Sequence, residues 1–92
     1  MRTKIVAKDY KKQTDYLKSV INSSKKHADS IRIKKEGLLL FPKFLCDIIV
    51  KNYKDDNFVE IYNNSVLDAY NEDKIQLDDM ESFMKAMYEA QQ

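Results

Sequence analysis

Residues 58–70, FVEIYNNSVLDAY, fit either of two structures, and the fold class depends on which one forms. The stretch has strong β propensity on both sides of a turn-like NNS triplet. Its apolar residues also repeat at helical spacing, and Asn57 with Glu60 has the spacing of a capping box. Two adjacent asparagines are poor in a helix interior, so we favour a hairpin. The predicted strands are Phe58–Tyr62 and Val66–Tyr70.

Residues 34–50, KKEGLLLFPKFLCDIIV, hold the only glycine and the only proline of the chain. Gly37 indicates a turn, because glycine takes positive φ at no steric cost, and it lies between an alternating SIRIKK pattern and an apolar LLLF run. Pro42 cannot donate to a strand ladder but suits the first turn of a helix. We therefore predict a hairpin over residues 31–41 and a helix over 42–53.

The two ends of the chain each favour a helix. The first begins at the N-cap candidate Asp9 and reaches about His27, after a possible edge strand at Thr3–Ala7. The last begins at Asp78, with Glu81 at the capping-box position, and carries a methionine-rich apolar face to about residue 90. The prediction is an α+β fold: N-terminal helix, β-hairpin, short helix, second β pair and C-terminal helix, as a single domain over 1–92.

Charge is divided unevenly along the chain. Residues 1–54 carry a net charge of +9 and residues 55–92 a net charge of −8. Such asymmetry points to nucleic acid or another charged partner, or to attraction between the two halves. The candidate nucleic-acid-binding residues lie around the predicted 31–41 hairpin, where lysine and arginine can neutralise phosphates. They are Lys25, Lys26, Arg32, Lys34, Lys35 and Lys43.

No residue pattern in the chain indicates catalysis. There is one cysteine and one histidine, so neither a Cys–His pair nor a zinc site is expected, and a single glycine cannot form a phosphate loop. Cys46 lies in an apolar run and is interpreted as a small buried hydrophobic residue. We predict no enzyme activity, no cofactor and no metal. Apolar runs are too short to span a membrane, and no signal peptide is evident, which predicts a cytoplasmic protein.

A family resemblance covers the middle of the sequence. Gly37, four apolar residues, Pro42, and then Leu45 and Ile49 resemble the centre of the AbrB/MazE/SpoVT-like swapped-hairpin regulators. An acidic DD spacer and then VEI at residues 59–61 stand where that family has its acidic spacer and following strand.

The resemblance spans about residues 30–70 and implies an intertwined homodimer that binds operator DNA through a basic face or serves as an antitoxin. Leu38 and Cys46 stand where that family usually has arginine, so those DNA contacts do not carry over. The leading hypothesis is a non-catalytic, dimeric, transcription-regulator-like protein that binds nucleic acid through its basic N-terminal half. The alternative is a small phage- or plasmid-type inhibitor or adaptor that binds a host protein through its acidic C-terminal half.

Overall fold

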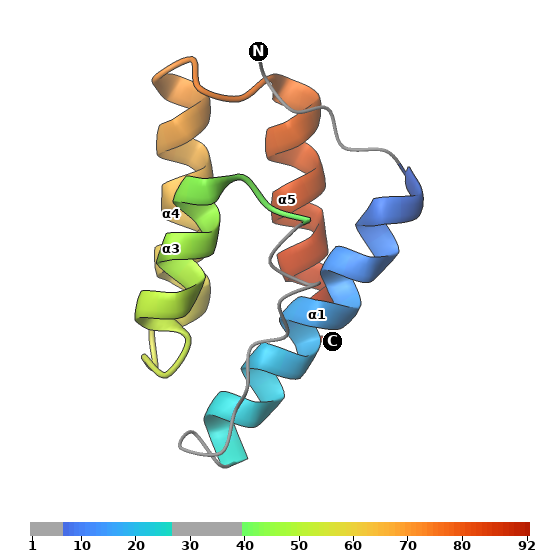
Figure 1. Cartoon of the computed structure of the whole chain (residues 1–92), viewed down its shortest axis with the longest axis vertical. Coiled ribbons are helices and arrows are strands. Elements are labelled where there is room, and N and C mark those ends of the chain that lie inside the picture. Colours follow the sequence, from blue (N-terminus) through green and yellow to red (C-terminus); the bar gives the residue numbers. More distant parts are fainter. Residues whose placement is uncertain (1–6, 27–39) are drawn as a thin grey trace.

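The computed structural model describes residues 7–26 and 40–92, with side chains for 11–22 and 40–92. These residues form four helices and contain no strand, so the predicted α+β fold is wrong (Figure 1). The helices are α1 (Ala7–Lys26), α3 (Lys43–Asn52), α4 (Phe58–Asn71) and α5 (Leu77–Ala90).

The second β pair, Phe58–Tyr62 with Val66–Tyr70, is the single helix α4. Four apolar side chains on one side of α4 are buried, and they are Phe58, Tyr62, Val66 and Ala69. Burying large apolar side chains contributes roughly 1.5–3 kcal/mol each. The two central asparagines each lose less than about 0.7 kcal/mol of helix propensity relative to alanine. Burial therefore outweighs the local preference that favoured a hairpin. The VEI triplet, a strand by resemblance to the swapped-hairpin regulators, lies in this helix.

Most of the predicted 31–41 hairpin, including Gly37, falls outside the described residues, and so does most of Thr3–Ala7. Within the described part, Leu40 and Phe41 lie in a turn and bend ahead of α3, not in a strand. Pro42 is the N-cap of α3, with φ −64° and ψ 156°, and its carbonyl accepts the first helical hydrogen bonds. The proline therefore begins the helix, as the sequence predicts.

The three predicted helices are confirmed with small shifts at their ends. Residues 42–53 contain α3, and the N-terminal and C-terminal helices correspond to α1 and α5. The cap of α5 lies two residues earlier than predicted. Gln76 is its N-cap, and the buried carboxylate of Asp79 accepts a hydrogen bond of 3.2 Å from the Gln76 backbone N–H. Asp79 therefore fills the role that the sequence assigned to Glu81.

Helix α4 ends in the turn before α5, and this turn contains no glycine. Asp73 has φ 64°, a left-handed conformation that aspartate tolerates better than most residues. The backbone N–H groups of Asp73 and Lys74 donate to the carbonyls of Tyr70 and Ala69 at 3.0 and 2.8 Å. This Schellman arrangement reverses the chain and sets α5 antiparallel beside α4 (Figure 1).

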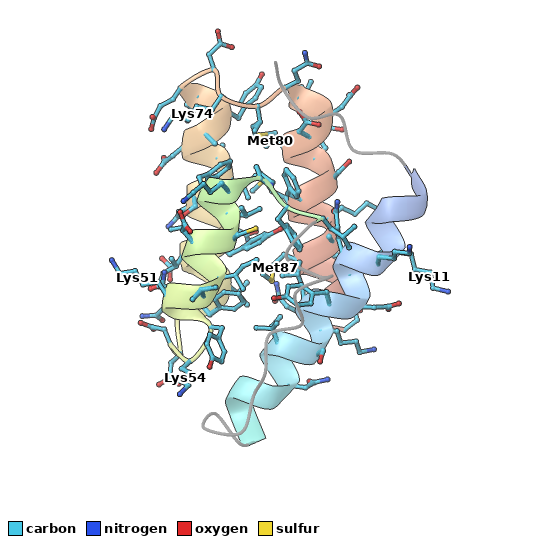
Figure 2. All side chains as sticks on the ribbon, viewed as in Figure 1. Lys11, Lys51, Lys54, Lys74, Met80 and Met87 are labelled. Carbon is cyan, nitrogen blue, oxygen red and sulfur yellow. The ribbon has the colours of Figure 1, made fainter. Side chains whose placement is uncertain are left out.

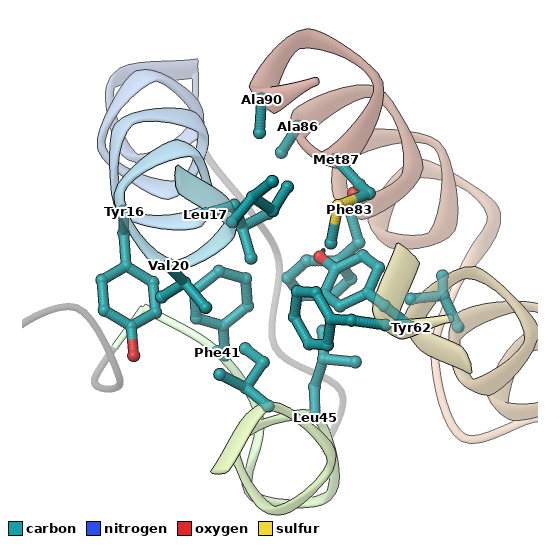
Figure 3. Close-up of a cluster of buried hydrophobic side chains, with 14 of the residues drawn as sticks. Tyr16, Leu17, Val20, Phe41, Leu45, Tyr62, Phe83, Ala86, Met87 and Ala90 are labelled. Atoms are coloured by element: carbon teal, nitrogen blue, oxygen red, sulfur yellow. Dashed lines mark hydrogen bonds between the residues drawn. The ribbon is translucent and has the colours of Figure 1, made fainter. Parts of the chain in front are cut away.

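Helix α5 is the centre of the packing, because it contacts both α1 and α4, while α3 contacts α4. Ala86 and Ala90 lie on the side of α5 that faces α1, and their small side chains allow close approach (Figure 3). The aromatic ring of Phe41 bridges the bundle, with ring centroids 5.8 Å from both Tyr16 and Phe83. The core contains residues of all four helices, together with one residue just before α3 and one in the turn between α4 and α5. It comprises Tyr16, Leu17, Val20, Ile21, Phe41, Leu45, Ile49, Phe58, Tyr62, Val66, Ala69, Ile75, Phe83, Ala86, Met87 and Ala90.

The buried phenol of Tyr62 predicts a loss of stability in alkali. Its hydroxyl donates to the carbonyl of Phe83 at 3.2 Å, and burial raises its pKa well above the usual value near 10. The unfolded chain therefore ionises this tyrosine at a lower pH than the native protein does. The free energy of unfolding is at its full value below about pH 10 and should fall by about 1.4 kcal/mol per pH unit above it on account of Tyr62.

Urea unfolding between pH 8 and pH 11, followed by circular dichroism, measures this effect against the variant Tyr62→Phe. The variant should lose about 1 kcal/mol at neutral pH, because one hydrogen bond is removed, and its alkaline slope should be shallower. Tyr88→Phe is the matched control, since that side chain is 65% exposed. Equal slopes in all three proteins would contradict the prediction.

Candidate functional site

The predicted nucleic-acid-binding residues are not brought together within the described part of the chain. Lys25 and Lys26 end helix α1, where the backbone alone is described, and Arg32, Lys34 and Lys35 fall outside the described residues. Lys43 is exposed at the start of α3 and pairs with Asp47 one turn later at 3.3 Å. Nucleic-acid binding through these residues stays a prediction.

The outer side of α3 adds lysines that the sequence did not single out. Lys51, near the end of α3, and Lys54, in the turn that follows it, are both exposed and point away from the core (Figure 2). Lys54 also lies 5.7 Å from the centre of the Tyr53 ring. Asp47 interrupts the lysines on this side, so the described basic surface is small and partly neutralised.

No catalytic group emerges among the described side chains. Cys46 is half-buried and donates to the carbonyl of Phe41 at 3.4 Å. Burial, with a smaller contribution from the Asp47 carboxylate, raises the pKa of its thiol, which disfavours the nucleophilic thiolate. No group of three potential metal ligands was found among the described residues, and none of the helices described there is long and apolar enough to cross a membrane.

The strongest site candidate is an apolar surface on the α4–α5 pair. Five large apolar side chains are exposed among the described residues, and four of them belong to these two helices. Half-buried apolar residues adjoin them and pack against the core. We define the α4–α5 face as Val59, Asn63, Leu67 and Tyr70 of α4 with Leu77, Met80, Met84 and Tyr88 of α5.

Helix geometry places both rows of the α4–α5 face on one side of the molecule. On α4 the row begins one residue after the buried line, with Val59 following Phe58; on α5, likewise, Met84 follows Phe83. Successive residues turn in opposite senses in two antiparallel helices seen from one end. On each helix the exposed row lies one residue after the row that faces the neighbouring helix. Because the two helices run in opposite directions, this offset brings both exposed rows to the same side of the pair.

The opposite side of the α4–α5 pair is covered by the other two helices. Figure 1 shows α3 in front of α4 and α1 crossing in front of α5, and both contacts are recorded between these elements. No described helix covers the α4–α5 face. Tyr88 is 65% exposed, although an aromatic side chain of this size usually gains from burial. Among the described residues, the face is therefore an apolar surface without a cover.

Acidic side chains border the α4–α5 face. Glu60 lies two turns before Leu67 on α4, and Glu81 lies between Leu77 and Tyr88 on α5; both glutamates are exposed. From Phe58 to Ala90 there are eight acidic and two basic residues, a net charge of −6. One of the two, Lys74, is paired with Glu72 at 3.1 Å. The surface thus combines an apolar centre with a negative surround.

A polar atom without a partner lies in the middle of the α4–α5 face. The side-chain oxygen Oδ1 of Asn63 is buried, and it has no hydrogen-bond partner within the described part of the chain. An unsatisfied buried acceptor costs roughly 1–3 kcal/mol. Because the atom is buried, a donor from a bound partner would reach it only after the Asn63 side chain rotates.

Part of this surface was predictable from the sequence. From the sequence, the methionine stripe is interpreted first as a core-facing or dimer-packing stripe, and second as an adaptable partner surface. In the structure Met87 is fully buried and Met80 is half-buried at the edge of the core (Figure 2). Met84 is half-buried and packs against the core in the same way. Leu67 and Tyr70 were missed, because a hairpin reading of residues 58–70 alternates their faces. A helical reading would have aligned them with Val59.

Comparison with known proteins adds no relative. No family model, curated protein or solved structure matches this chain.

Proposed function

We propose that this chain is a non-catalytic protein-binding module, an inhibitor or adaptor, that binds a partner protein through the α4–α5 face. The observation that carries the proposal is that, within residues 11–22 and 40–92, four of the five exposed large apolar side chains lie together on this side of the α4–α5 pair, which no described helix covers. Tyrosine and methionine are enriched in the centres of protein interfaces. An exposed patch of this kind, rimmed by polar residues, is typical of a binding site.

The charge of the surface indicates the kind of partner. A net charge of −6 from Phe58 to Ala90 favours association with a basic protein surface and disfavours nucleic acid at this site. The proposal corresponds to the second of the two hypotheses drawn from the sequence, in which the acidic C-terminal half binds a host protein.

Affinity capture with the full chain as bait tests the proposal. Tyr88→Ala and Leu67→Ala should each reduce capture of a specific, stoichiometric partner at least tenfold, since truncating an interface anchor commonly weakens binding by that much. Quantitative mass spectrometry of the captured proteins gives the measurement. Val50→Ala is the matched control, because Val50 is 53% exposed but lies on α3, away from the face.

Three results would count against the proposal. One is a partner captured equally by all four proteins, which would place the interface elsewhere. Another is a dimer in analytical ultracentrifugation that Tyr88→Ala dissociates, because a second copy would then cover the face. The third is the absence of any partner together with binding of duplex DNA that weakens steeply with salt, which would support the nucleic-acid hypothesis instead.

A further inference from the structure

We propose that the element received by the α4–α5 face is a cationic amphipathic helix of the partner protein. This inference rests on the proposed function and names the chemistry of the segment that binds. It is argued from the shape of the apolar row, from the charge around it and from the buried oxygen of Asn63.

The apolar row on α5 has the spacing and length that suit another helix. Leu77, Met80, Met84 and Tyr88 follow i, i+3, i+7 and i+11 spacing and are all at least partly exposed. Eleven residues of helix span about 16 Å, which is three turns. An amphipathic helix offers anchors at the same interval along its own apolar side. A third helix laid beside the antiparallel α4–α5 pair would thus find apolar contacts along its whole length.

The charge around the α4–α5 face indicates which polar residues the bound helix should carry. Glu60 borders the face on the α4 side and Glu81 borders it on the α5 side, so lysine or arginine at both edges of the bound helix would find an opposite charge. A second copy of this chain presenting the same face would instead bring like charges together around the contact. An anionic helix would meet the same repulsion.

The side chain of Asn63 supplies a polar feature within this surface. Its Oδ1 atom has no donor among the described residues, although it is buried. Rotation of this half-exposed side chain would present the amide to a lysine or arginine of the bound helix, both of which carry only donors. A purely apolar partner would leave the oxygen unsatisfied.

Three synthetic peptides of 18 residues provide the test, with fluorescence anisotropy against the full chain as the measurement. One carries leucine at i, i+3, i+4 and i+7 spacing with lysine elsewhere. The second replaces each lysine by glutamate, and the third scrambles the leucine–lysine sequence so that no apolar side forms. The first should bind at least tenfold more tightly than either of the others. Tyr88→Ala and Leu67→Ala should each weaken it at least tenfold, and Val50→Ala should leave it unchanged.

Equal binding of the scrambled peptide would overturn the inference, because charge alone would then explain the affinity. Binding that Tyr88→Ala and Leu67→Ala leave unchanged would also overturn it, because the peptide would then be bound elsewhere. No binding of the first peptide would exclude a cationic amphipathic helix as the ligand. Affinity capture that still depends on Tyr88 and Leu67 would in that case uphold the proposed function with a different ligand.

Discussion

Replacing Phe83 by alanine should remove most of the stability of this protein. Phe83 is 1% exposed on the central helix α5, its ring lies 5.8 Å from that of Phe41, and its carbonyl accepts the hydrogen bond from Tyr62. A buried phenylalanine truncated to alanine costs about 3–5 kcal/mol, through lost burial and the cavity left behind. Domains of this size have total stabilities toward the lower end of roughly 5–15 kcal/mol.

Urea unfolding followed by far-ultraviolet circular dichroism gives the free energies for this comparison. Tyr88→Ala truncates an aromatic side chain on the same helix, but one that is 65% exposed, and it should change the free energy of unfolding by no more than about 0.5 kcal/mol. A loss below about 1 kcal/mol for Phe83→Ala would show that the packing around α5 is not the main source of stability.

The substitution Asn64→Pro should lower the melting temperature by roughly 12–24 °C. Asn64 is exposed in the middle of α4, so the new side chain removes no packing contact. Proline there lacks the N–H that donates within the helix, and its ring clashes with the preceding turn, at a cost of about 3 kcal/mol or more. For a domain of this length each kcal/mol corresponds to about 4–8 °C.

Thermal unfolding of Asn64→Pro beside Asn64→Ala separates a helix from a hairpin at residues 58–70. Alanine is the better helix former and should raise stability by a few tenths of a kcal/mol. In the hairpin predicted from the sequence, Asn64 would lie in the turn between the two strands, so proline there would remove no hydrogen bond of a helix or a strand. A melting temperature for Asn64→Pro within about 4 °C of the original protein would support that hairpin.

The contrast between α3 and α4 shows how far local sequence determines this fold. Helix α3 was predictable because Pro42 marks its start and its apolar residues repeat only at helical spacing. Residues 58–70 fit both the helical and the strand periodicity. The prediction therefore depended on local propensity alone, which favoured the wrong structure. The deciding contribution was burial against α3 and α5, a tertiary effect that the local pattern does not contain.

The candidate site was less predictable than the helices that form it. Its two rows come from helices joined by a short turn, and their alignment depends on α4 being helical. Exposure of Tyr88 and burial of Met87, one position apart, follow from the orientation of α5 between α1 and α4. The acidic character of the region, by contrast, was evident from the sequence, because charge is a property of composition and requires no fold.

The position of α5 also bears on the order in which the protein can fold during synthesis. Of the described helices, α1 is made before the others, yet its contacts are chiefly with α5, which is made after them. Chains are synthesised at roughly 5–20 residues per second, far slower than helices and short loops form. The α3–α4 pair can therefore assemble before α5 is available. During that time α1 has no partner among the described helices, and its apolar residues Leu17 and Val20 are exposed. A ribosome stalled before α5 would hold a nascent chain with this apolar side uncovered, which is a natural target for a chaperone.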